Sequence, residues 1–265
     1  MKHFRFAFFG AVLCLALLTA FADNASADVC TGNCGTSGAD GVVGLSPTGN
    51  AAYQWVSTTD GLVGTGTIPV GAPAGNENNG STFATSMFTV NANSTLNFYF
   101  NYVTSDGTGF ADYAWAELFD SSNNPVALLF TAQTETSGNI VPAPGLQLPD
   151  PSATLTPPAT PIIPGMSTWS PLGSWSGTCF ISPSSGCGNT GWIQSNYVIS
   201  GAGTYYLEVG VVNAFDDQYD SGLAFDGVAI NGEPINPPVG TPEPGTLALM
   251  SFGILGLAAA KLSKK

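Results

Sequence analysis

Basic side chains are absent from most of this sequence. All five Lys and Arg residues and the single His lie in the first five and the last five positions, so residues 28–240 carry none. That absence excludes a Ser–His–Asp triad, a Cys–His pair, a Schiff-base lysine, a Walker lysine and a His-ligated zinc site from this region. It also excludes side-chain salt bridges there. Nucleic acid is excluded as a partner because its phosphates need basic contacts.

The carboxylates therefore have no basic partners. All of the 18 Asp and Glu residues except Asp23 and Glu243 lie in residues 28–240, and the formal net charge is −13. Such groups must be solvated, hydrogen-bonded, protonated or bound to cations. Acidity for solubility and acidity for cation binding both fit this composition. Acid–base chemistry by two carboxylates, as in glycosidases, remains available.

The first 27 residues have the features of a secretory signal peptide. Lys2 and Arg5 supply a basic n-region, residues 6–21 an apolar h-region, and Ala25-Ser26-Ala27 a cleavage site of the A-x-A type. We therefore expect Asp28 to be the mature N-terminus. An uncleaved membrane anchor is the alternative.

The segment 241–265 combines three features in order. Pro242-Glu243-Pro244 is a stiff, extended tripeptide. Leu247–Ala260 is an apolar run without a charge, and three lysines follow it. The run is shorter than the ~20 residues that usually span a bilayer, and the lysines favour a cytoplasmic C-terminus. An amphipathic or core helix is the alternative interpretation.

This order of motif, hydrophobic helix and basic tail resembles the PEP-CTERM sorting signal of Gram-negative, biofilm-forming bacteria. The resemblance covers only about the last tenth of the chain. It implies that an exosortase-type membrane enzyme cleaves near Pro242, Glu243 and Pro244. It also implies that the hydrophobic helix holds the protein transiently at the inner membrane before the chain is passed onward.

Short strands, not helices, are expected between the two signals. Leu96, Phe98, Phe100 and Tyr102 alternate with more polar residues, which is typical of a strand with one buried face. Residues 205–211 repeat the pattern. Further strands are expected at 53–58, 82–90, 113–119, 126–131, 192–199 and 222–230. Antiparallel strands at this spacing predict an all-β fold, a β-sandwich of jelly-roll type.

Residues 141–171 hold nearly half of the 19 prolines. Proline offers no amide hydrogen to a β-ladder, so this segment is not expected to form a central strand. We expect a long polyproline-like loop on a single domain that spans residues 28–240. A linker between two domains is the competing interpretation. The loop is favoured because neither flank has enough strands for a closed sandwich.

Four cysteines remain after removal of the signal peptide: Cys30, Cys34, Cys179 and Cys187. An even number in an exported chain indicates disulfides, with three possible connectivities. We favour the local pairs Cys30–Cys34 and Cys179–Cys187, the second of which would close a turn-rich loop. A four-thiolate zinc site is the alternative, and it needs reduced thiols.

Closely spaced aspartates form a candidate calcium site, because calcium takes six to eight oxygen ligands in flexible geometry. Asp226 shares strand parity with Ala224, Val228 and Ile230, so its carboxylate needs a partner if that face is the core. The alternative is aspartates hydrogen-bonded to turn amides. The candidate ligands are Asp106, Asp112, Asp216, Asp217, Asp220 and Asp226.

Two other groups of residues are candidates for binding or catalysis. Trp169, Trp175 and Trp192 flank the second pair of cysteines and could stack on sugar rings or fill the core. Glu117 and Glu208 lie on expected strands and could form a carboxylate pair. Sequence spacing does not show whether the two glutamates meet.

These observations predict an exported, non-enzymatic β-sandwich protein of the cell surface or extracellular matrix, with a structural or adhesive role and stabilised by calcium. The first alternative is a carbohydrate-binding module that uses the tryptophans. The second alternative is a glycoside hydrolase. The expected partners are the exosortase-type enzyme, the inner membrane and an extracellular polysaccharide.

Overall fold

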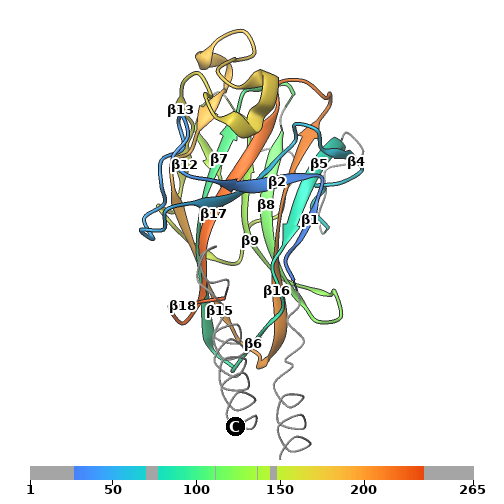
Figure 1. Ribbon diagram of the computed structural model, residues 1–265, viewed down its shortest axis with the longest axis vertical. Coiled ribbons are helices and arrows are strands. Elements are labelled where there is room, and N and C mark those ends of the chain that lie inside the picture. Colours follow the sequence, from blue (N-terminus) through green and yellow to red (C-terminus); the bar gives the residue numbers. More distant parts are fainter. Residues whose placement is uncertain (1–26, 70–76, 111, 136, 144–147, 236–265) are drawn as a thin grey trace, which may run out of the picture. The chain divides into compact units, whose positions relative to one another are not determined.

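The computed structural model describes residues 27–69, 77–110, 112–135, 137–143 and 148–235 (Figure 1). Among these residues no helix is long and apolar enough to cross a membrane. The signal-peptide helix, the C-terminal hydrophobic helix and the Pro242–Pro244 motif all lie outside the described residues. The helical flanks of the predicted fold therefore remain predictions.

Two antiparallel sheets form the described part of the chain. The first sheet has the order β1 (Val29–Thr31), β5 (Glu77–Ala84), β16 (Gly203–Ala214), β8 (Tyr113–Asp120) and β9 (Pro125–Gln133). Two short strands join it, β4 (Leu62–Val63) beside β5 and β6 (Phe88–Val90) beside β16.

The second sheet has the order β11 (Thr154–Thr156), β15 (Ile193–Ile199), β7 (Ser94–Thr104), β17 (Ser221–Ile230), β3 (Tyr53–Ser57) and β2 (Asn33–Ser37). The short strands β13 (Ile163–Pro164), β14 (Gly188–Asn189) and β18 (Glu233–Pro234) attach to it, and β10 (Asn139–Val141) pairs with β12 (Thr160–Pro161). Two 3-10 helices, η2 (Ser170–Trp175) and η3 (Pro183–Ser185), both lie in the loop between β13 and β14.

The main hydrophobic core lies between the two sheets. The alternating residues Leu96, Phe98, Phe100 and Tyr102 of β7 are all buried there, as the sequence pattern predicts. From β9, Phe130 stacks on Phe100 with ring centroids 3.7 Å apart. Burying side chains of this size contributes roughly 1.5–3 kcal/mol each. The predicted antiparallel β-sandwich is confirmed.

The predicted strand 82–90 is wrong as a single strand. It divides into β5 and β6, which both pair with β16. Thr85 interrupts the strand. Its hydroxyl accepts the Leu207 amide hydrogen at 3.0 Å, in the place of a backbone carbonyl of the β-ladder. The Pro-rich segment also contains more structure than the expected loop. Its strand β11 carries no proline and pairs only with β15 among the described strands.

Smaller apolar clusters cover the outer faces of the sheets. Tyr113 and Trp115 pack on the outer face of the first sheet, where the Trp115 Nε1–H donates to the Gly66 carbonyl at 2.6 Å. Gly210 on β16 admits the indole, because a Cβ there would lie 2.5 Å from Trp115 Cε2. Tyr53 and Trp169 pack in the cluster on the second sheet. Both sheets are therefore covered on their outer faces by loops.

Candidate functional site

Three loops meet at one end of the sandwich, which we call the loop end. They are residues 105–110 and 112 after β7, residues 165–187 between β13 and β14, and residues 215–220 between β16 and β17. In Figure 1 these loops lie at the end away from β6 and β18. Backbone hydrogen bonds join them: the Ser105 amide donates to the Asp220 carbonyl at 3.1 Å, and the Phe180 amide donates to the Ser105 carbonyl at 2.9 Å.

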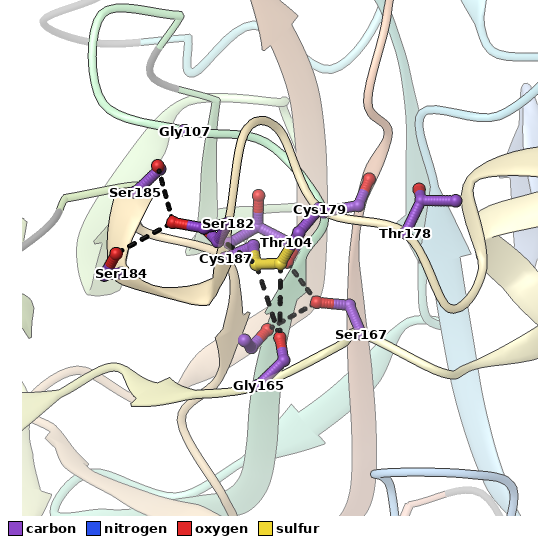
Figure 2. Close-up of a disulfide and its surroundings, with 12 residues drawn as sticks. Thr104, Gly107, Gly165, Ser167, Thr178, Cys179, Ser182, Ser184, Ser185 and Cys187 are labelled. Atoms are coloured by element: carbon purple, nitrogen blue, oxygen red, sulfur yellow. Dashed lines mark hydrogen bonds between the residues drawn. A yellow bond between two sulfur atoms is a disulfide. The ribbon is translucent and has the colours of Figure 1, made fainter.

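A disulfide fixes the longest of the three loops. Cys179 and Cys187 are bonded with their Cα atoms 5.8 Å apart, and Cys30 is bonded to Cys34, which is the local pairing that the sequence favours. Figure 2 shows both sulfur atoms of the Cys179–Cys187 bond beside the Gly165 carbonyl oxygen, at 3.5 and 3.3 Å. The nearby Ser167 hydroxyl donates to the Thr104 carbonyl at the end of β7 (Figure 2). The loop is thus attached to the sheet at its base.

Removing the Cys179–Cys187 bond should weaken the protein without unfolding it. The bond joins residues eight positions apart, and closing so short a loop stabilises by about 2.5 kcal/mol in the chain-entropy model. We expect a Cys179→Ser, Cys187→Ser variant to melt at a lower temperature and to keep its near-UV circular dichroism, because the inter-sheet core does not include the loop. Unchanged melting, or loss of the native spectrum at low temperature, would show that the bond has another role.

Asp112 is the most enclosed carboxylate at the loop end. Its Oδ1 accepts the Ala214 amide hydrogen at 3.0 Å, and its Oδ2 accepts the Ser221 hydroxyl hydrogen at 2.6 Å. Burial, followed by the charge of Asp106, raises the pKa of Asp112 well above its usual range. The side chain therefore joins the end of the loop before β8 to both strands that flank the 215–220 loop.

Asp220 and Asp106 complete a group that we call the buried acid group. Asp220 accepts hydrogens from the hydroxyls of Thr58 and Thr59, at 2.8 and 2.6 Å, and burial raises its pKa. Asp106 Oδ1 accepts the Gly107 amide hydrogen at 2.7 Å, whereas its Oδ2 is buried and has no hydrogen-bond partner. Burial raises the pKa of Asp106 to about 8, and the charges of Asp216 and Asp220 contribute.

The six candidate calcium ligands do not come together. Asp226 lies about 20 Å along β17 from Asp220, given the usual rise per residue, and accepts hydrogens from Ser46, Thr48 and Asn50. Within the described ranges, no three His, Cys, Asp or Glu side chains are arranged to hold a metal ion. Calcium binding therefore remains a prediction.

A bulge explains why the strand parity assigned to Asp226 holds for Ala224 but is wrong for Val228. The register of β17 against β7 shifts between Asp226 and Ala229, where Gly227 has a φ of +68°. Val228 consequently enters the inter-sheet core, while Asp226 keeps the outward side of Ala224. Hydroxyls of the 46–50 loop supply the partner that the carboxylate needs.

The three candidate tryptophans occupy different environments. Trp169 is 0% exposed and belongs to the cluster on the second sheet, with its Nε1–H donating to the Tyr53 hydroxyl at 2.9 Å. Trp192 is half-buried, and its Nε1–H donates to the Gly44 carbonyl at 2.9 Å. Trp175 is half-buried at the loop end. Trp169 is therefore a core residue and unavailable for stacking on a sugar.

Trp175 belongs to a group of rings that sequence reasoning missed. Its ring centroid lies 4.4 Å from that of Tyr219, which contacts Phe180 edge-on at 5.4 Å. Phe180 in turn contacts Phe110 edge-on at 5.3 Å. We call these four residues, one or two from each loop, the aromatic cluster. Each is half-buried. Their positions beside turn residues give no sequence signal that they meet.

Glu117 and Glu208 do meet. They are direct cross-strand partners on β8 and β16, on the outer face of the first sheet. Burial, followed by the charge of Glu208, raises the pKa of Glu117 to about 7. Glu117 Oε2 is buried without a hydrogen-bond partner, and the residue is only 3% exposed. A substrate therefore has no access to this carboxyl in the structure.

Residues 241–264 match the family described as the PEP-CTERM protein-sorting motif. The chain carries a PEP-CTERM sorting signal. The resemblance seen in the sequence is thus confirmed, and the motif marks the protein for processing by an exosortase and for export to the surface of a Gram-negative bacterium. No curated protein sequence matches the chain.

Several solved structures are distantly similar to this chain. The K1 cleaved adhesin domain of Lys-gingipain from Porphyromonas gingivalis W83 has 12% identity and a TM-score of 0.33, with 77% of this chain and 89% of that chain covered. The mannan-recognising carbohydrate-binding module TmCBM27 has 14% identity and a TM-score of 0.32, covering 75% and 87%. TmCBM61, in complex with beta-1,4-galactotriose, has 9% identity and a TM-score of 0.29, covering 75% and 85%. Similarities this low say nothing of what this chain binds.

Proposed function

We propose that this PEP-CTERM protein is a non-catalytic, structural or adhesive component of the extracellular matrix. The proposal rests on the sorting motif at residues 241–264, because such a motif directs the preceding β-sandwich to the outside of the cell. Two disulfides support it, since such bonds persist in oxidising compartments. Residues 28–240 carry acidic side chains and no basic ones. Such a surface favours solubility outside the cell and does not attract nucleic acid.

Carbohydrate binding is the second candidate function, and the aromatic cluster favours it. Of its four residues, only Trp175 is among the tryptophans that the sequence analysis expects to stack on sugars. Trp169 is also expected to do so, but it is fully buried. Catalysis by Glu117 and Glu208 is not proposed, because the 3% exposure of Glu117 closes the pair to substrate.

The C-terminus of the extracellular protein tests whether the sorting signal directs its export and is cleaved. We expect the extracellular species to end near Thr241–Pro244, because the motif precedes the hydrophobic run and the lysines. A Pro242→Ala, Pro244→Ala variant should stay with the cells, whereas the matched Pro237→Ala, Pro238→Ala variant should be released. The measurement is the intact mass of the protein in the medium, matrix and membrane fractions. Recovery of Lys265 on the matrix species would refute the sorting mechanism.

A further inference from the structure

We infer that Asp106 and Gly107 form a succinimide, an imide ring that links the Asp106 side chain to the backbone nitrogen of the next residue. Asp-Gly dipeptides begin at Asp40, Asp60, Asp106 and Asp226. Asp106 is the most enclosed of these four aspartates, with only 1% of its surface exposed. This self-modification of the loop end does not depend on the proposed extracellular function.

The two reacting groups already lie in contact. The Gly107 amide nitrogen is 2.7 Å from Asp106 Oδ1. The carboxyl carbon Cγ is bonded to Oδ1, so it lies within about 4 Å of the same nitrogen. Groups held together react readily when the reacting atoms are about 3–3.5 Å apart. Glycine suits this position, because it has no side chain beside the attacking nitrogen.

Neighbouring contacts hold this dipeptide in place. The Asp106 amide donates a hydrogen bond to Thr104 Oγ1 at 3.0 Å, at the end of β7. The Phe180 ring packs against the next residue, where a Cβ on Gly107 would lie 2.5 Å from Phe180 Cδ1. The nitrogen and the carboxyl are therefore kept close together by the surrounding structure.

The surroundings of Asp106 keep its carboxyl in the neutral form, which an amide nitrogen can attack, whereas the negative charge of a carboxylate opposes attack. Burial raises the pKa of Asp106 to about 8, and the charges of Asp216 and Asp220 contribute. Asp112 faces it as well, and residues 28–240 contain no basic side chain. An ordinary aspartate with a pKa near 4 is neutral in roughly one molecule in a thousand at pH 7. The reactive form of Asp106 is therefore about a thousandfold more abundant.

The ring closes with the loss of one water molecule. The Gly107 nitrogen forms a bond to Asp106 Cγ, and the bond between Cγ and Oδ2 breaks. Oδ2 leaves as water, with its own hydrogen and the hydrogen that the nitrogen gives up, while Oδ1 remains as a ring carbonyl oxygen. Among the described residues Oδ2 has no hydrogen-bond partner that would hold it back. No oxidant, reductant or other reactant is needed.

The burial of the site also preserves the ring once it has formed. Water must reach the imide to open it, and a site that excludes water slows such hydrolysis. The ring replaces a buried acid, for which residues 28–240 offer no basic partner, by a neutral group. Ring closure is slow compared with folding, so freshly purified protein keeps the Asp106 carboxyl.

Peptide mapping of the full exported protein tests the inference. The folded protein is kept at pH 7 and 37 °C in chelator for several weeks and then digested with pepsin, because residues 28–240 offer trypsin no Lys or Arg. We expect the peptide with Asp106 to lose the mass of one water at least about tenfold faster than the peptides with Asp60 or Asp226. Hydroxylamine, which attacks succinimides, should cleave the aged chain after Asp106. Electrophoretic mobility at pH 7 should stay unchanged, because the carboxyl is already mostly neutral there.

Two variants and one solvent condition separate the effect of the fold from that of the dipeptide. Asp106→Ala should abolish the mass loss in its peptide, whereas Asp60→Ala should leave the rate at Asp106 unchanged. Unfolding in urea should reduce the rate at Asp106 to that of the other Asp-Gly dipeptides. Equal rates at all four dipeptides of the folded parent, or no water loss at Asp106, would overturn the inference. That comparison needs only the parent protein, so it decides even if Asp106→Ala does not fold.

Discussion

Replacing Trp169 with alanine should lower the free energy of unfolding by about 3–5 kcal/mol, the usual cost of removing a buried indole. Trp169 is fully buried. Its ring meets Trp55 edge-on at 6.5 Å, and a Cβ on Gly222 would lie 2.5 Å from its Cζ3. The substitution would also leave the Tyr53 hydroxyl without the indole N–H. Urea denaturation of the full exported protein, followed by fluorescence, measures the change.

Trp192→Ala is the matched control for this prediction. Trp192 is half-buried, and its ring contacts Tyr53 edge-on at 5.6 Å. We expect a loss of about 1 kcal/mol, which is typical of a substitution outside the core. Equal losses for Trp169→Ala and Trp192→Ala would contradict the burial argument. A Trp169→Ala variant that stays stable but loses affinity for glycans would restore the interpretation of Trp169 as a stacking residue.

The central strands could be predicted from the sequence, but the environment of Trp169 could not. Alternation along β7 and β16 is a local signal, and both strands formed where the pattern placed them. Trp169 sits in a Ser- and Pro-containing loop, and its burial depends on Tyr53, 116 positions away in the sequence. A contact between residues so far apart in the sequence produces no periodic pattern from which it could be predicted. The aromatic cluster was missed for the same reason.

The acidic residues show a second limit of sequence reasoning. The chain's lack of basic residues correctly indicated that buried carboxylates would need other partners, and hydroxyls of Ser and Thr supply most of them. Which aspartates would meet depended on register. The Gly227 bulge separated Asp226 from the expected face, while the β8–β16 register brought Glu117 opposite Glu208. Neither could be derived from spacing along the chain.

Without divalent cations, the protein should become less stable as the pH rises from 5 to 8. The folded-state pKa values of Asp106 and Glu117 are raised to about 8 and about 7, mainly by burial, whereas unfolded Asp and Glu titrate near 4. A raised folded pKa means that the folded state holds protons that the unfolded state releases. The stability from these groups is therefore complete below about pH 4 and is lost as the pH rises through about 7–8.

Thermal unfolding in chelator at matched ionic strength measures this loss. One pKa unit corresponds to about 1.4 kcal/mol, so the two raised pKa values together correspond to a decrease of up to about 6 kcal/mol between pH 5 and pH 8, or roughly 10–25 °C in melting temperature. Asp106→Asn should reduce the slope of the profile, because the amide resembles the protonated acid, while Glu117 keeps its own contribution. Asp226→Asn, in its separate hydroxyl-bonded site, should leave the slope intact. A flat profile for the parent protein would contradict the buried titration.

Calcium provides the last and sharpest test of the buried acid group. If the sequence-based calcium prediction is right, calcium at pH 8 should replace the missing protons and raise the melting temperature more than magnesium does, because magnesium requires stricter octahedral geometry. At one hundred times the dissociation constant, one site adds about 2.7 kcal/mol. The gain should shrink at pH 5, because the raised pKa of Asp106, about 8, keeps that carboxyl protonated there. It should vanish in Asp220→Asn, whereas Glu233→Gln, exposed on β18, should keep it. Equal shifts in melting temperature with calcium and with magnesium would refute the calcium prediction. The buried carboxyls would then be neutralised by protons alone.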